Sequence, residues 1–214
     1  MAKRLTPLIY VDSSVLLDLI TDEKTLVPET EVPRGVAAEH ILQGIEEGKA
    51  RFATSALVEI EVYTTPMVRS NNLVGRVQEA LAARFSHRET VWCDIDRIVA
   101  QHALEVAGKI GPPYKSGKKI KSADVGHLAA AVRARCDYFM TTDGGFPINT
   151  TIDNTNIRFP HPVLSATQDD HGGVMVGDDG FSVVSSPAGL GLAGLSWSRA
   201  CWVARVVARS VSRR

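Results

Sequence analysis

The chain has 214 residues, 44% of them hydrophobic and 22% charged, so it carries enough apolar side chains for a globular core. Lysine plus arginine and aspartate plus glutamate both number 24, which excludes a global positive field for a polyanion. A nucleic acid would have to be held by a local basic patch or through metal ions.

The cysteines and the N-terminus indicate the compartment. Cys93, Cys136 and Cys201 are odd in number and follow no CxxC spacing, which argues against a disulfide framework and against a zinc cluster. We expect core or free thiols in a reducing compartment. The first apolar run is interrupted at Tyr10 and Asp12 and is too short for a signal peptide or a membrane span. We therefore expect a cytoplasmic protein without a membrane partner.

Short apolar runs alternate with segments of helical periodicity along most of the chain. The predicted strands cover residues 8–11, 51–54, 91–93, 136–141 and, as a last edge strand, 157–159. The predicted helices cover residues 15–20, 36–47, 73–85, 95–109, a segment that begins at 56 with Ser55 as its N-cap, and 123–135 with Ser122 as its N-cap. This alternation predicts an α/β fold in which helices cover both faces of a central parallel sheet, a three-layer sandwich.

Two segments do not fit this alternation. Residues 111–119 contain Gly-Pro-Pro followed by lysines and predict a basic loop. After Ser165 glycine, serine and aspartate dominate, which is typical of a linker, and arginine-rich residues 197–214 close the chain. We predict a domain over residues 1–163 and a disordered tail over 164–214. The alternative for the last segment is an amphipathic helix that binds a membrane or a partner.

Four acidic residues occupy positions at which a sheet of this kind binds ligands. Asp12 and Asp143 each follow a predicted strand, and ligands bind beyond the carboxyl ends of parallel strands. Asp124 lies in the first turn of one predicted helix and Glu61 lies within another. Converging carboxylates repel one another unless cations neutralise them, and such oxygen ligands suit Mg²⁺ or Mn²⁺. The alternative for an acid after a strand is a simple helix cap.

Four blocks of sequence carry a resemblance to a known family. They are YVDSSVL at residues 10–16, Ser55 with Glu61, DVGHLAAA at residues 124–131 and CDYFMTTD at residues 136–143. In this order they resemble the successive motifs of PIN domains, especially those of VapC-type toxins. The resemblance implies a five-stranded parallel sheet with flanking helices and a Mg²⁺- or Mn²⁺-dependent endoribonuclease site. It also implies a homodimer inhibited by a small antitoxin.

The resemblance assigns roles to individual residues. Asp12 and Asp124 would be the most direct metal ligands, and Glu61 and Asp143 would complete the cluster. The hydroxyl residues expected to orient a carboxylate or a water are Ser14 and Thr141. The function implied is RNA hydrolysis by the toxin of a toxin–antitoxin pair. The alternatives are a housekeeping RNA-processing nuclease and a non-catalytic PIN-like RNA-binding module.

Three local assignments have a competing interpretation. Glu59 competes with Glu61, because residues two positions apart on a helix point about 200° apart and only one can face the site; we choose Glu61 for its spacing from Ser55. His127 is either a catalytic base or a packed, hydrogen-bonded partner. A run of lysines before Asp124 either binds RNA phosphates or is a solvated loop; its members are Lys115, Lys118, Lys119 and Lys121.

Overall fold

A mostly parallel sheet forms the centre of the computed structural model, which describes residues 6–28, 30–70, 75, 77–78, 81–82, 89–111 and 120–160. The strands are β1 (Leu8–Val11), β2 (Arg51–Thr54), β3 (Val91–Trp92), β4 (Tyr138–Met140), β5 (Thr150–Ile152) and β6 (Thr155–Arg158). The helices are α1 (Ser13–Thr21), α2 (Arg34–Glu46), α3 (Ala56–Thr64), α4 (Pro66–Ser70), α6 (Arg97–Ile110) and α7 (Ser122–Arg133).

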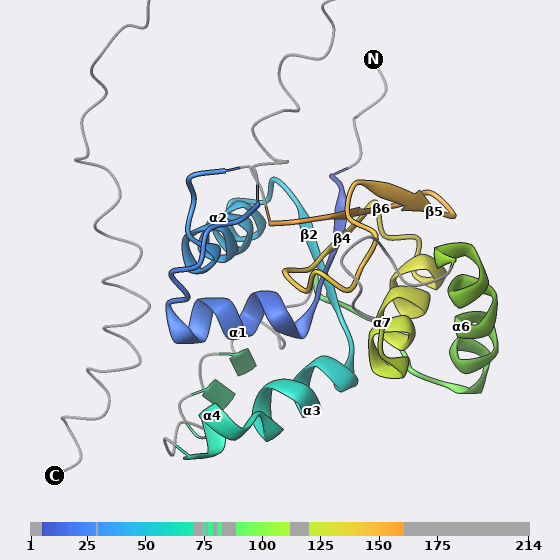
Figure 1. Ribbon diagram of the computed structural model, residues 1–214, viewed down its shortest axis with the longest axis horizontal. Helices are drawn as coiled ribbons and strands as arrows, with labels where there is room; N and C mark the ends of the chain where they lie inside the picture. The colour runs from blue at the N-terminus through green and yellow to red at the C-terminus, as the bar shows by residue number, and fades with distance from the viewer. Residues whose placement is uncertain are drawn as a thin grey trace, which may run out of the picture. The chain divides into compact units, whose positions relative to one another are not determined.

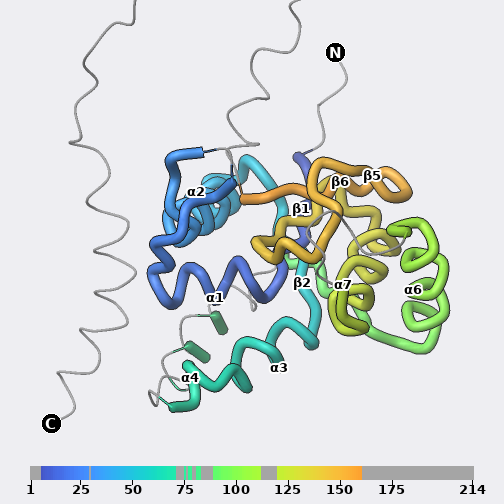
Figure 2. The backbone as a smooth tube through the Cα atoms, viewed as in Figure 1, coloured from blue at the N-terminus to red at the C-terminus, as the bar shows by residue number. Residues whose placement is uncertain are grey.

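The strand order is β3-β2-β1-β4-β6-β5, which places β1 in the interior of the sheet. All four residues of β1 are buried, and the strand pairs in parallel with β2 and β4, with Tyr10 opposite Ala53 and Phe139. Helices α1 and α2 pack together on one side of the sheet, and α6 and α7 pack together on the other (Figures 1 and 2). The predicted α/β sandwich with a central parallel sheet is therefore confirmed.

The sheet has six strands among the described residues, not the five that the family resemblance implies. The additional strand is β5, which pairs antiparallel with β6 through the two-residue turn Asp153-Asn154. Both turn residues have positive φ, 45° and 72°. A two-residue hairpin turn needs such values if its twist is to match the right-handed twist of the two strands that it joins. The strand predicted at residues 157–159 is present as part of β6, but its expected position at the edge was wrong, because β5 covers that edge.

Aromatic packing joins the central strands to the segment after β4. The rings of Tyr10 and Phe139 stack with centroids 5.4 Å apart, and Phe146 packs on Phe139 at 4.9 Å. All three residues are almost fully buried. Cys93 and Cys136 are buried free thiols, as predicted, whereas Cys201 lies outside the described residues.

Several helix starts differ from the predicted ones. Ser122 is the first residue of α7 and not its cap; the N-cap is Lys121, whose backbone N–H donates to the Asp124 carboxylate at 2.9 Å. Helix α6 begins at Arg97 because the Asp96 side chain accepts a hydrogen bond from Val99 N at 2.8 Å. Helix α3 begins at Ala56 as predicted, but its N-cap residue makes no capping hydrogen bond with its side chain.

Some predictions lie outside the described residues. They are most of the helix at 73–85, the basic loop at 112–119, and everything from residue 161 onward, which includes the proposed domain boundary and the tail. No helix in the described ranges is long and apolar enough to cross a membrane.

The close approach of α1 and α2 depends on Gly35. A Cβ atom at this position would lie 2.9 Å from Glu23 N and 3.1 Å from Asp18 O, both of them backbone atoms. Because backbone atoms cannot move aside cheaply, α2 must shift if the side chain grows.

We therefore expect Gly35→Ala to destabilise the protein by roughly 1–3 kcal/mol, the usual cost of overpacking. Gly108→Ala is the matched control, because Gly108 lies in α6 and a Cβ atom added there would meet nothing within 4 Å. That control should be neutral or stabilising by about 0.5–1 kcal/mol. Urea unfolding of the purified chain measures both, and equal effects of the two substitutions would contradict this account.

Candidate metal centre

The acidic residues converge at the carboxyl edge of the sheet. Asp12 follows β1 directly, and Asp143 lies three residues beyond the end of β4. Glu61 comes from α3, which contacts both α1 and α7, and Asp124 comes from the first turn of α7. Segments far apart in the sequence therefore contribute side chains to one place, as the parallel topology requires.

Asp12 is held by hydroxyl groups from two segments. Its side chain is 4% exposed and occupies the N-cap position of α1 without making a capping hydrogen bond, so the simple helix-cap alternative does not describe it. Oδ2 accepts hydrogen bonds from Ser14 Oγ at 2.7 Å and from Thr141 Oγ1 at 2.8 Å. Ser14 and Thr141 therefore orient this carboxylate in the structure.

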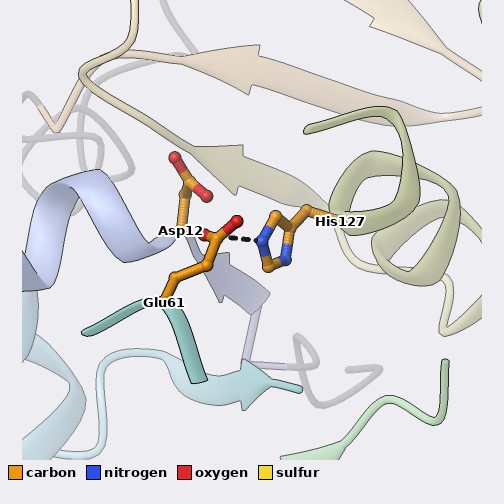
Figure 3. A group of neighbouring side chains, drawn as sticks. All are labelled: Asp12, Glu61 and His127. Atoms are coloured by element: carbon orange, nitrogen blue, oxygen red, sulfur yellow. Dashed lines mark hydrogen bonds and ion pairs between the residues drawn. The ribbon is translucent and has the colours of Figure 1, made fainter. Parts of the chain in front are cut away.

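Glu61, not Glu59, faces Asp12. Its Oε2 atom accepts a hydrogen bond from Ser13 Oγ at 2.5 Å and is 3.0 Å from His127 Nε2 (Figure 3). Glu59 instead interacts with the Tyr63 hydroxyl one turn further along α3. Burial raises the pKa of Glu61, but the hydrogen bonds and the charges of His127 and Lys121 lower it more, so the net shift is downward.

A buried chain of hydrogen bonds continues behind Glu61. His127 is fully buried, and its Nδ1 atom is 2.8 Å from the Tyr10 hydroxyl, which is itself 2.7 Å from Ser55 Oγ. This contact explains why the Ser55 hydroxyl does not cap α3 as predicted. Burial is also the main reason that the pKa of Tyr10 is well above its ordinary value.

Asp124 and Asp143 are tied to backbone N–H groups. Asp124 Oδ2 accepts from Lys121 N at 2.9 Å, and Asp143 Oδ1 accepts from Gly145 N at 2.9 Å. Burial raises the pKa of Asp124 and the charges of Asp12 and Asp143 raise it further, while Lys121 opposes the shift. Asp12 and Asp143 are therefore each near enough to Asp124 to repel its carboxylate.

The four carboxylates share one pattern of hydrogen bonding. Each uses a single oxygen for its hydrogen bonds; within the described part of the chain the other oxygen accepts none, and the free atoms are Asp12 Oδ1, Glu61 Oε1, Asp124 Oδ1 and Asp143 Oδ2. One group among the described residues brings potential metal-binding atoms within 4.8 Å of one another: Asp12, Glu61 and His127. Free, oriented carboxylate oxygens at a site of mutual repulsion fit a divalent cation.

The structure thus brings together most of the residues singled out in the sequence. Asp124 and Asp143 are electrostatically coupled to Asp12 but lie outside the group of three that is close enough to share one ion. Lys121 is exposed, and its charge acts on Glu61 and on Asp124. The other lysines of the predicted basic segment, Lys115, Lys118 and Lys119, lie outside the described residues.

Sequence reasoning missed Ser13 and Tyr10 as parts of this site. Ser13 is the first residue of α1, where its hydroxyl can reach the helix that follows β2. A tyrosine within the buried apolar run 8–11 was the available signal for Tyr10, because a buried phenol needs a hydrogen-bond partner.

No family model matches the chain, and no curated protein matches it in sequence. Among solved structures, VapBC2 from Rickettsia felis bound to a promoter DNA fragment is similar, with 12% identity over 71% of this chain and 98% of that chain, at a TM-score of 0.48. A toxin–antitoxin complex from Klebsiella pneumoniae is 17% identical over 72% and 98% of the two chains, at a TM-score of 0.47.

A third similar structure is VapC20 from Mycobacterium tuberculosis, described as a toxin that cleaves the sarcin-ricin loop. It is 16% identical over 68% of this chain and 97% of that chain, at a TM-score of 0.44. The resemblance noted in the sequence is to the same kind of protein, but identities and TM-scores of this size assign no role to any residue of this chain.

Because the charge of Asp12 helps to raise the pKa of Asp124, Asp12→Asn should lower the pKa of Asp124 in the metal-free protein. Titration of the carboxyl carbon by NMR, with Asp153→Asn on the distant β5–β6 turn as control, measures this shift. A raised folded-state pKa means that ionisation of Asp124 opposes folding, so its contribution to stability falls as pH rises through that pKa. An unchanged pKa of Asp124 in Asp12→Asn would contradict the coupling.

Proposed function

We propose that this protein is an endoribonuclease that hydrolyses RNA phosphodiester bonds with Mg²⁺ or Mn²⁺. The observation that carries the proposal is the set of four carboxylates, each with one oxygen oriented by hydrogen bonds and one oxygen that accepts none from the described residues. A binding module without metal would have no physical reason to keep carboxylates that repel one another, because that repulsion destabilises the folded state when no cation neutralises it.

In this proposal Asp12 and Asp124 are the most direct metal ligands, and Glu61 and Asp143 complete the cluster. These four carboxylates would hold the divalent ions, and the ions would supply Lewis acidity for activating a water and for neutralising charge on the phosphate. The hydroxyls of Ser14 and Thr141 keep the Asp12 carboxylate in one orientation, so that its free oxygen is presented without further rearrangement.

The RNA backbone would be held by basic residues next to the carboxylates. Lys121 is exposed at the start of α7, three residues before Asp124, and its charge reaches two of the four acids. An ammonium group there can pair with a phosphate adjacent to the one being cleaved. Lys115, Lys118 and Lys119 precede it in sequence and are proposed to extend the same contact.

We further propose that the nuclease is the toxin of a toxin–antitoxin pair, with a small cognate antitoxin and a homodimeric state. This part rests on the resemblance of the four sequence blocks to VapC-type toxins, and not on the geometry. A housekeeping RNA-processing nuclease would use the same carboxylates, so the two roles differ in partner and not in chemistry.

RNA cleavage by the purified full chain tests the chemistry. With Mg²⁺ or Mn²⁺ we expect cleavage that EDTA abolishes and that Asp12→Asn reduces by roughly 100-fold or more, because a ligand is lost while the shape of the side chain is kept. Asp137→Asn is the matched control: this aspartate accepts a hydrogen bond from Leu8 N at the amino end of β1.

The outcomes separate the candidate functions. Equal loss in both variants would indicate a fold defect, and full activity of Asp12→Asn would overturn the proposed site. If no RNA is cut with either ion, the non-catalytic binding module becomes the better explanation.

The toxin role predicts growth arrest when the protein is expressed alone. Asp12→Asn should relieve the arrest, because it leaves the surface intact but removes the cleavage. Co-expression of a small protein encoded next to the gene should also relieve it. If cells that express the active wild-type enzyme without an antitoxin grow normally, the housekeeping role is favoured.

A further inference from the structure

His127 lies behind one of the proposed ligands rather than facing open space. The imidazole is fully buried and both of its nitrogens have side-chain neighbours, Glu61 Oε2 at 3.0 Å from Nε2 and the Tyr10 hydroxyl at 2.8 Å from Nδ1. Figure 3 shows the ring directed at the Glu61 carboxylate, with Asp12 beside that carboxylate. The ring therefore has little freedom to rotate.

The ionised Glu61 carboxylate determines which atoms donate in the series of hydrogen bonds from Glu61 through His127 and Tyr10 to Ser55. An ionised carboxylate only accepts hydrogen bonds, so Nε2 must carry a proton and donate it to Glu61 Oε2. In a neutral imidazole Nδ1 then accepts from the Tyr10 hydroxyl, whose oxygen accepts from Ser55. In a charged imidazole the last two bonds reverse, but the bond from Nε2 to Glu61 is the same.

We propose that His127 is a positioning residue for the metal centre and not a metal ligand. This inference rests on the proposed function, because it takes Glu61 to be a ligand. His127 and Ser13 together hold Oε2, which leaves Oε1 as the atom presented to the ion. Tyr10 and Ser55 in turn hold the ring in the orientation that donation from Nε2 requires.

The alternative is that Nε2 itself binds the ion, since it belongs to the group of three whose atoms lie within 4.8 Å of one another. That arrangement would need Nε2 to give up its proton and Glu61 to lose one of its two hydrogen bonds. It would also mix a nitrogen ligand into a set that otherwise offers only carboxylate oxygens, the ligands that Mg²⁺ and Mn²⁺ prefer.

Metal binding by two variants of the full chain tests the positioning role. His127→Gln keeps an N–H donor at about the reach of Nε2, whereas His127→Leu fills similar space without a donor. We expect Mn²⁺ affinity, measured from the EPR signal of free Mn²⁺, to fall by roughly 10–100-fold in His127→Leu, as for other groups that orient ligands, and to be largely restored in His127→Gln.

A second measurement does not depend on the variants folding. In the ¹⁵N-labelled wild-type protein, Nε2 of His127 should show a directly bonded proton, and this proton should persist after Mg²⁺ is added. Loss of the proton on Mg²⁺ binding would identify His127 as a direct ligand and overturn the inference, as would equal Mn²⁺ affinity of folded His127→Leu and the wild type.

The same experiments distinguish this inference from the proposed nuclease function. A wild-type protein that binds Mn²⁺ in the predicted way but cuts no RNA would leave the positioning role standing and remove the enzymatic one. If the wild-type protein cuts RNA but its Mn²⁺ affinity does not change when His127 is substituted, the nuclease function stands and the positioning role is overturned.

Discussion

Repulsion between carboxylates at the carboxyl edge of the sheet is the constraint on which the rest of the site depends. Burial is the largest cause of the raised pKa of Asp124, and the charges of Asp12 and Asp143 each raise it further. Neighbouring donors offset part of this cost by hydrogen-bonding one oxygen of each acid, and among the described residues the other oxygen has no such donor. A divalent cation is the simplest ligand that would neutralise the repulsion that these hydrogen bonds leave uncompensated.

Hydroxyl side chains join the loop after β4 to the start of α1. Ser14 Oγ donates to Asp12 and accepts a hydrogen bond from Thr142 N at 3.0 Å, while Thr141 Oγ1 bonds both Asp12 and Asp143 N. The two neighbouring strand ends are therefore held in register by the same contacts that orient the acid. Loss of either hydroxyl would loosen the carboxylate and the loop together.

A hydrogen-bonded series runs through the interior of the domain from Ser55 through Tyr10 and His127 to Glu61. Buried polar groups of this kind stabilise a fold only when every donor and acceptor is paired, and here each one has a partner. Ser55 gives up the helix cap that its position would otherwise provide. Departures of this kind from local rules are concentrated at functional sites.

The sequence by itself determined the α/β class, the position of β1 and β2, and the candidate acids, because apolar runs and helical periodicity are local signals. It also indicated Asp12 and Asp143 at strand ends, where parallel topology alone brings side chains together. Tertiary structure decided what depends on contacts between distant segments. The hydrogen bonds from Ser13 and His127 identify Glu61, rather than Glu59, as the glutamate that faces the site. The Asp153-Asn154 turn adds strand β5, whose pairing with β6 exists only in the folded sheet.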